Sequence, residues 1–451
     1  MLGVLALGCG SGGGRGTPID SGVTARDGAA EAHPDGRTLP GDAGGDVSRG
    51  RDAARDARVG DAARADGSSA DGRAPPGTDG AVPTTCSDGA PVAYARTSCP
   101  GAPGVVSGTL VSQAGFDTRG ETLPLDGLGE TSLPCYPTIV CVANGAPTLL
   151  FSDDPESPSA DGVLYADVLA PGPYRAYVYH VNAGAGLRKF PVVLLNQGSA
   201  TVNVTITAEG IAGPSQDYVA VGKQAIQGWL GSQGMSTVVP VPAGQRVLLD
   251  ASLDAVHAAM NELAHAIIDF SVDGAVKASV VSVLDTEDAT VVTAGLSLLA
   301  NDGLHTRGSF AHAALEIEAR APLDGQGARR LRFGDNVTDE TLTGHDYVDG
   351  TSVTLDGNYG VSYTLGLTVT VNTTLLLSPQ GGAWGGVASI PSGIDGASGV
   401  TLLPSATDSL ASQTDAIVLG VFAAGAVSGL TLMSAGGSNL PVDLVTVPLA
   451  P

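Results

Sequence analysis

The sequence predicts an all-β protein in which two antiparallel β-sandwich-like domains follow a disordered N-terminal tether. Three observations support this fold class. Apolar and polar side chains alternate along several segments, as they do in half-buried antiparallel strands. Turns rich in Asn, Asp and Gly separate these segments. Residues 10–80, by contrast, contain few large apolar side chains and cannot build a core of their own.

Composition excludes several classes of partner. The 451 residues carry 22 Lys and Arg against 46 Asp and Glu, for a formal net charge of −24. Phosphate backbones and anionic lipid headgroups repel so acidic a chain, so we expect no nucleic-acid partner and no membrane docking by charge. The length allows two or three domains, each with a hydrophobic core. No segment approaches the run of about 18 apolar residues that a membrane-spanning helix needs.

The N-terminal segment 1–9 is a short apolar run that ends at a cysteine, Leu5-Ala-Leu-Gly-Cys9. It resembles the lipobox of bacterial lipoproteins, and the resemblance implies part of a secretory signal peptide with Cys9 as the lipidated residue. A plain signal with a free thiol is the alternative. We therefore expect an exported protein on the outer surface of the bacterial cell envelope, either lipid-anchored or secreted. A lipid anchor would be its only contact with membrane.

Residues 10–80 form the predicted tether, because Gly, Ala, Asp and Arg offer too little apolar surface to offset the entropy of ordering. Residues 81–147 form a β-rich extension that contains four cysteines, namely Cys86, Cys99, Cys135 and Cys141. Their spacings do not fit a four-cysteine zinc site, so we expect disulfides formed in an oxidising compartment. Four cysteines allow alternative pairings, and we favour the sequence-local pairs Cys86–Cys99 and Cys135–Cys141.

Two segments show the strand pattern most clearly. Thr201–Ala208 places Val202, Val204, Ile206 and Ala208 on one face. Ser362–Asn372 places Tyr363, Leu365, Leu367, Val369 and Val371 on one face. Further predicted strands are Tyr174–Val181, Pro191–Leu195, Ala266–Val272, Val276–Val283, Leu315–Ala319, Asp415–Phe422 and Val442–Val447. We place a domain boundary after Pro240-Val-Pro-Ala-Gly, which gives one sandwich over 148–246 and a second over 247–451.

Two short helices interrupt the strands. The segment Ala220–Gly231 predicts a surface helix that carries Trp229. A second helix is predicted to begin at Ser252, an N-cap residue type, because apolar side chains then recur at helical spacing. Those side chains are Leu253, Val256, Met260 and Leu263.

An aromatic cluster is the first candidate binding site. Tyr174, Tyr177, Tyr179, His180 and Trp229 come from nearby segments of a chain that is only 4% aromatic. Aromatic faces with polar tips suit sugar rings, which combine apolar faces with hydroxyl groups. The alternative is that these side chains fill the core of a sheet otherwise built from Ala, Val and Leu.

Two acidic segments are candidate calcium sites, because calcium prefers oxygen ligands. The first contains Asp153, Asp154 and Glu156, and the second contains Asp335 and Asp339. Solvated acidic turns are the alternative, and we expect no other cofactor. His257, Glu262 and His265 do not fit a zinc motif, because the histidines are eight residues apart. His265 alternates with Ala266 and should therefore point away from the core.

Several segments of residues 148–450 carry a resemblance to a known family. They are Gly162–Asp167, Tyr174–Asn182, Lys189–Asn196, Gly210–Ser215, Asp217–Gly222, Arg307–Phe310, Asp335–Asp339, Gly357–Gly360, Pro379–Gly382 and Ser438–Val442. Through them the chain resembles an uncharacterised family of secreted bacterial β-rich surface proteins. The resemblance implies an exported β-rich module and no established catalytic residues.

The sequence therefore predicts a non-catalytic surface lipoprotein of the cell envelope that recognises cell-wall or extracellular polysaccharide. Two alternatives stay open, since no catalytic spacing decides between them. One is a carbohydrate-active hydrolase or lyase that uses acidic residues. The other is a structural or adhesive protein that binds another envelope protein.

Overall fold

The computed structural model describes residues 86, 92–96, 118–125, 133–136, 138–319, 322–323, 325, 327–334 and 339–449. The predicted signal segment, the tether, Cys99 and Asp335 lie outside these residues. The chain divides into two units, Met1–Gly77 and Thr78–Pro451, and every described residue belongs to the second unit.

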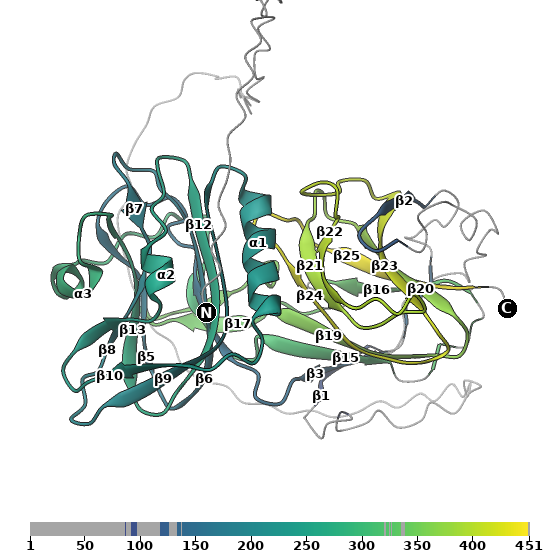
Figure 1. The fold of residues 1–451 in the computed structure, drawn as a ribbon, viewed down its shortest axis with the longest axis horizontal. Coiled ribbons are helices and arrows are strands. Elements are labelled where there is room, and N and C mark those ends of the chain that lie inside the picture. The colour runs from purple at the N-terminus through teal and green to yellow at the C-terminus, as the bar shows by residue number, and fades with distance from the viewer. Residues whose placement is uncertain are drawn as a thin grey trace, which may run out of the picture. The chain divides into compact units, whose positions relative to one another are not determined.

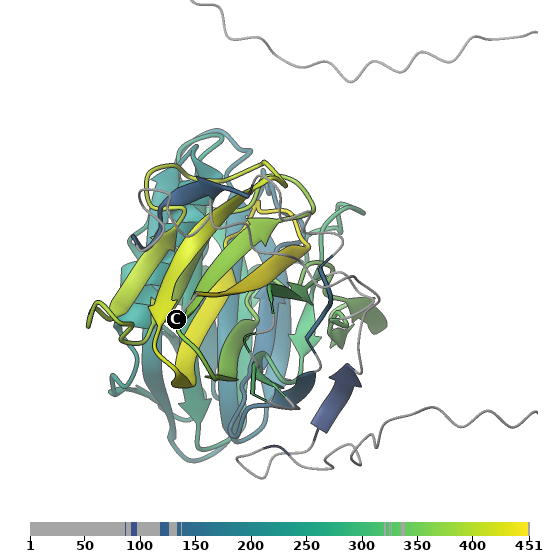
Figure 2. The same ribbon diagram turned by 90° about the vertical axis from the view of Figure 1, so that its right-hand side faces the viewer.

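The described residues confirm the all-β class. They form two sandwiches, each made of two sheets (Figure 1). In the first sandwich an eight-stranded sheet has the order β10-β9-β12-β6-β4-β14-β17-β18 and packs on a smaller sheet with the order β11-β8-β13-β5, to which β7 is attached. In the second a seven-stranded sheet has the order β1-β3-β15-β19-β24-β21-β22 and packs on a sheet with the order β16-β25-β20-β23-β2. Figure 2 shows the layers of the second sandwich.

The strands of the first sandwich are β4 (Thr148–Ser152), β5 (Gly162–Leu169), β6 (Gly172–Val181), β7 (Arg188–Lys189), β8 (Val192–Leu195), β9 (Val202–Ser215), β10 (Thr237–Val241), β11 (Arg246–Leu248), β12 (Leu263–Val272), β13 (Val276–Leu284), β14 (Arg307–Phe310), β17 (Thr343–Asp346) and β18 (Thr351–Thr354).

The strands of the second are β1 (Val92–Arg96), β2 (Thr122–Pro124), β3 (Thr138–Val142), β15 (Ala314–Ala319), β16 (Arg329–Phe333), β19 (Ser362–Val369), β20 (Thr373–Pro379), β21 (Gly386–Ile390), β22 (Gly399–Leu403), β23 (Asp415–Phe422), β24 (Gly425–Ser434) and β25 (Val442–Pro448). Antiparallel pairing dominates as predicted, but β4 pairs with β6 and β15 pairs with β19 in parallel.

The alternation predicted for two strands is confirmed. In β9 the four predicted inward side chains are all buried, and in β19 Tyr363, Leu365, Leu367 and Val369 are buried. Burying such a row of apolar side chains removes several hundred Å² of surface from water, which is the main stabilising contribution in a sandwich core. Val202, Val204 and Ile206 lie in the core between the two sheets of the first sandwich. Ala208 and the β19 row lie in a larger core that includes α1 and residues of both sandwiches.

The predicted domain boundary after residue 246 is wrong. The strand β12 pairs with both β6 and β9, and β13 pairs with β5 and β8, so the first sandwich continues well beyond 246. Pro240 and Val241 end β10, and the turn that follows them carries the chain from β10 in one sheet to β11 in the other. The extension 81–147 is not a separate module either, because β1 and β3 belong to a sheet of the second sandwich.

The helix α1 (Tyr218–Gly231) confirms the first predicted helix, and the Asp217 side chain caps it by accepting the N–H of Ala220. It covers the eight-stranded sheet and lies between the two sandwiches (Figure 1). It approaches β9 closely at Gly210, where a Cβ atom would overlap the carbonyl oxygen of Ala225. Both faces of this sheet are therefore covered around β6, β9 and β12.

The second predicted helix is wrong for most of its length. The helix α2 covers only Ala251–Asp254, and its N-cap is Asp250, whose carboxylate accepts two backbone N–H groups. Met260 is 58% exposed and Leu263 begins β12. The short helices α3 (Ala289–Val292) and η2 (Thr293–Gly295) follow β13. No helix of the described residues is long and apolar enough to cross a bilayer.

The favoured disulfide pairs are also wrong, because Cys86 is bonded to Cys141 with 6.2 Å between their Cα atoms. Strand pairing explains this: β1 runs beside β3 with Val92 opposite Cys141, which brings the chain near Cys86 against the end of β3. Both sulfurs lie in a small core with Ile139. Cys135 is also disulfide-bonded.

Candidate functional site

The predicted aromatic binding surface is mostly core. Tyr177, Tyr179 and Trp229 are 2%, 4% and 3% exposed, and His180 is fully buried. The rings of Tyr177 and Tyr179 stack beneath α1 with 6.2 Å between their centroids. The core-filling alternative therefore holds for these four side chains. Tyr174 is partly exposed, stacks on Phe270 and donates its hydroxyl to the carbonyl of Ala170.

His180 and His265 lie on opposite faces of the eight-stranded sheet, and both are buried. The Nδ1 atom of His180 is 3.0 Å from the carbonyl of Pro155 and therefore carries the proton, while the Ser152 hydroxyl donates to Nε2. His265 was expected to point away from the core, but α1 covers its face of the sheet. Burial lowers the pKa of His180 to about 3 and that of His265 to about 4.

The first predicted calcium segment forms hydrogen bonds and ion pairs with a distant loop. The Glu156 carboxylate lies 3.0 Å from His305 Nε2, and Asp302 lies 2.7 Å from His305 Nδ1. Asp154 accepts the N–H of Asp302. Burial would raise the pKa of Asp302, but hydrogen bonds from the backbone and ring of His305 lower it. In the part of the chain that the structure describes, no group of three or more His, Cys, Asp or Glu is arranged to hold a metal ion.

The second predicted calcium segment is described only in part. Asp335 lies outside the described residues. Asp339 is buried and accepts the N–H of Gly334 and the hydroxyl of Tyr363.

Asp153 is a carboxyl with a strongly perturbed pKa. Burial raises its pKa well above the usual range, and the negative charges of Glu156, Asp302 and Asp154 raise it further. Its Oδ1 atom is buried and has no hydrogen-bond partner among the described residues. Burial raises the pKa of the Tyr179 and Tyr359 hydroxyls, and the negative charge of Asp153 raises both further. We refer to Asp153, Glu156, Tyr179 and Tyr359 as the acid–tyrosine cluster.

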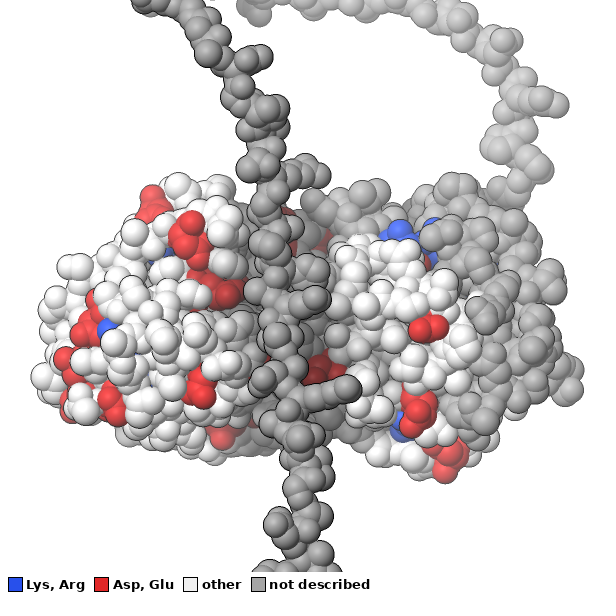
Figure 3. All heavy atoms as spheres, turned by 90° about the horizontal axis from the view of Figure 1, so that it is seen from above, with Lys and Arg blue, Asp and Glu red and all other residues white. Residues whose placement is uncertain are grey.

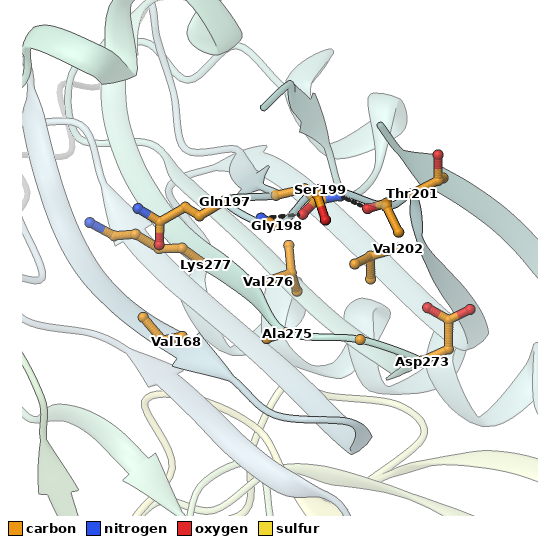
Figure 4. A pocket seen from close by; sticks show the side chains of 13 residues that line it. Val168, Gln197, Gly198, Ser199, Thr201, Val202, Asp273, Ala275, Val276 and Lys277 are labelled. Carbon is orange, nitrogen blue, oxygen red and sulfur yellow. Dashed lines mark hydrogen bonds between the residues drawn. The ribbon is translucent and has the colours of Figure 1, made fainter. Parts of the chain in front are cut away.

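A groove lies on the first sandwich, away from this cluster. It has a volume of about 580 Å³ and is formed by the end of β5, the β8–β9 loop and the β12–β13 turn (Figure 4). Lys277 extends at one end and Asp273 lies at the other, with Val276 and Val202 between them (Figure 4). Gln197, Ser199 and Thr201 supply further polar groups. Strands and hydrogen-bonded turns thus hold apolar and polar side chains together on one open surface.

The buried side chain of Asn196 fixes the loop on one side of the groove. Its amide donates to the carbonyls of Ala200 and Val241, and its oxygen accepts the N–H of Gly198. Such Asx turns order a loop without regular secondary structure. The opposite side is fixed by Asp273, which accepts both the N–H and the side-chain amide of Asn203.

A second hollow of about 460 Å³ shares Val168 and Lys277 with the groove. It is lined also by Asp167, Tyr347 and Val348, where the edge strand β5 meets the β17–β18 turn. Tyr347 is 59% exposed, and Val168 is 61% exposed. We refer to the two hollows together as the Lys277 groove.

Sequence reasoning missed the Lys277 groove. Its residues come from four separate parts of the chain, and the strand pattern shows only that Lys277 alternates with buried neighbours. One usable signal was the rarity of lysine: Lys189, Lys223 and Lys277 are the lysines of the chain. On the face shown in Figure 3, acidic side chains far outnumber basic ones among the described residues.

Comparison with known proteins identifies no family. No family model and no curated protein matches the chain. Among solved structures, the coconut allergen cocosin is 11% identical with a TM-score of 0.12, over 65% of this chain and 86% of that chain. Oxalate decarboxylase from Bacillus subtilis is 11% identical with a TM-score of 0.11, over 67% of this chain and 78% of that chain. Likeness at this level supports no argument about fold or function.

Proposed function

We propose that this protein is a non-catalytic surface lipoprotein of the bacterial cell envelope that recognises cell-wall or extracellular polysaccharide through the Lys277 groove. The observation that carries the proposal is the exposure of Tyr347 and Val168 beside a groove lined with polar side chains. Sugar rings present apolar faces and hydroxyl edges, and a glycan chain needs both kinds of contact. The lipobox-like segment ending at Cys9 supports a location at the envelope.

The groove also suits a polymer because it is open. Its two hollows adjoin through Val168 and Lys277, so a chain of several sugars can lie along them. The hydrogen bonds of Asn196 and of Asp273 hold the loops that line the groove, which limits the entropy lost on binding.

A pull-down of the full chain on insoluble cell-wall and extracellular polysaccharide fractions tests the proposal. We expect retention without release of soluble sugar. Tyr347→Ala should weaken retention, because it removes the exposed aromatic ring. Leu304→Ala is the matched control, since Leu304 is 85% exposed and lies outside the residues that line the groove. Equal retention of both variants would count against the groove as the binding site.

The acid–tyrosine cluster supports a second candidate function, cleavage of carbohydrate. Burial raises the pKa of the Asp153 carboxyl, and a carboxyl with a raised pKa is the kind of group that serves as a general acid. Release of soluble sugar that Asp153→Asn abolishes would favour this function over simple recognition. Failure of every polysaccharide fraction to retain the protein would instead favour a structural or adhesive role with a protein partner.

A further inference from the structure

We infer that the protein selects anionic polysaccharides through Lys277, which lines the groove, and Arg246, which lies outside the lining residues but in the same cross-strand row, as the side chains that contact carboxylate groups along the glycan. This inference rests on the proposed function and specifies the chemical class of the ligand.

The first step is the position of the two cations. On the smaller sheet of the first sandwich, Arg246 is opposite Leu195, Leu195 is opposite Lys277, and Lys277 is opposite Val168. Residues that are directly opposite on neighbouring strands project from the same face of a sheet. Arg246 and Lys277 therefore belong to one row, which also contains the apolar side chains of Leu195 and Val168. Their Cα atoms are two strand spacings apart, which is about 10 Å.

The second step is that neither cation forms an ion pair or a side-chain hydrogen bond with any residue that the structure describes. Every other Lys or Arg side chain that the structure describes takes part in an ion pair or a hydrogen bond. These residues are Arg119, Arg175, Arg188, Lys189, Lys223, Arg307, Arg329, Arg330 and Arg332. In a chain with 46 acidic residues, two unpaired cations in one cross-strand row form a distinct local feature.

The third step is that each oxygen of the two carboxylates that line the groove already accepts a hydrogen bond from the protein. Asp273 accepts two hydrogen bonds from Asn203, one on each oxygen. Asp167 accepts the N–H of Val168 and the hydroxyl of Ser309, again one on each oxygen. Asp167 is opposite the buried Ala278 and so projects from the other face of the edge strand, although it also lines the second hollow together with Lys277.

The side-chain groups of this row that remain available for hydrogen bonds are therefore the donors of Lys277 and Arg246. Lys277 offers an ammonium group, and Arg246 offers a planar fork that matches a carboxylate in two parallel hydrogen bonds. Leu195 is half-buried and Val168 is exposed, so both can contact the apolar face of a sugar ring between the charged groups. A glycan with carboxylates spaced along it fits this arrangement better than a neutral one.

The overall charge of −24 does not oppose such contacts at physiological salt. The Debye length there is about 8 Å, so acidic groups elsewhere on the surface are largely screened from a ligand in the groove. Direct contacts with Lys277 and Arg246 are shorter and are screened less.

The test compares two forms of one polymer, polygalacturonate and its fully methyl-esterified neutral form, in binding assays with the full chain. We expect polygalacturonate to bind more tightly, and Lys277→Gln or Arg246→Gln to weaken it about five-fold each, as for an exposed ion pair worth about 1 kcal/mol. The double variant should lose most of the preference and bind both forms alike. Arg119→Gln is the control, because it removes the same charge far from the row and should leave the preference unchanged.

Equal binding of the two forms by the unmodified protein would overturn the inference, and so would a double variant that keeps the preference. The proposed function would survive either result, because the neutral form would still be bound through the groove. A further outcome is that the protein binds neither form of polygalacturonate while the pull-down still retains it on other neutral polysaccharides. That result would also overturn the inference and leave the proposed function standing. If no polysaccharide of any kind is bound, both fail. Circular dichroism of each variant confirms that the fold is intact.

Discussion

Arg175 and Asp269 form a two-point ion pair between neighbouring strands, with Nε 2.6 Å from Oδ1 and Nη2 2.9 Å from Oδ2. The guanidinium group of Arg175 lies 4.4 Å from the centre of the Trp229 ring and donates to the carbonyls of Ala313 and Gly360. One side chain therefore joins the eight-stranded sheet, α1 and the segments that flank the seven-stranded sheet. Its contacts are internal, which indicates a structural role.

Asp269→Asn should lower the free energy of unfolding by about 3 to 5 kcal/mol, because it leaves the Arg175 charge buried without its counterion. Urea unfolding at pH 7 measures this as a lower midpoint with an unchanged slope. Asp395→Asn is the control: Asp395 is 44% exposed and pairs with Arg119, so its loss should cost less than about 1 kcal/mol. Equal costs for the two variants would show that the buried pair is not needed for stability.

Gly210→Ala should destabilise the protein by about 2 kcal/mol or more, because the added methyl group overlaps the backbone of α1 at Ala225. Gly231→Ala at the end of the same helix meets no atom within 4 Å and should be neutral or slightly stabilising. The thermal midpoints of the two variants check this. A Gly210→Ala protein as stable as the Gly231→Ala protein would contradict the close approach of helix and sheet.

Local pattern was enough to predict the strands but not which of their faces are covered. The alternation of 201–208 correctly assigns Val204 and Ile206 to the core. The same reasoning fails for His265, because α1 buries the second face of the sheet. One signal was present: β12 reads Leu-Ala-His-Ala-Ile-Ile, a nearly continuous apolar run, which is typical of strands buried on both faces.

Long-range pairing explains the remaining errors. No periodicity within the sequence shows that β12 returns to pair with β6 and β9, so a turn after Pro240 was interpreted as a domain boundary. The Lys277 groove was beyond prediction for the same reason. Tyr347 and Val168 are far apart in sequence, and only the meeting of two sheet edges brings them to one hollow.

The disulfide between Cys86 and Cys141 should contribute about 4 kcal/mol, since it closes a loop with a sequence separation of 55 residues in the unfolded chain. Replacing both cysteines by Ala should lower the urea midpoint accordingly. Reductant added to this double variant should cause a further loss, because Cys135 is also disulfide-bonded. A double variant with the stability of the unmodified protein would contradict the prediction.

Acid should destabilise the fold through its buried histidines. Burial lowers the pKa of His265 to about 4 in the folded state, while an unfolded histidine titrates near 6.5. The unfolded state therefore binds more protons between these values, so stability is fully present above about pH 6.5 and is lost as pH falls toward 4. The loss from His265 alone should reach about 3 kcal/mol at pH 4.

The variant His265→Gln isolates this effect, because the amide can still donate to the carbonyl of Val178 that His265 contacts. We expect the difference in unfolding free energy between pH 7 and pH 4 to shrink by about 3 kcal/mol relative to the unmodified protein. His257→Gln is the control, since the His257 side chain is exposed and its removal should leave the difference unchanged. Urea unfolding at both pH values gives the four free energies. An unchanged difference in His265→Gln would show that this histidine is not held neutral by burial.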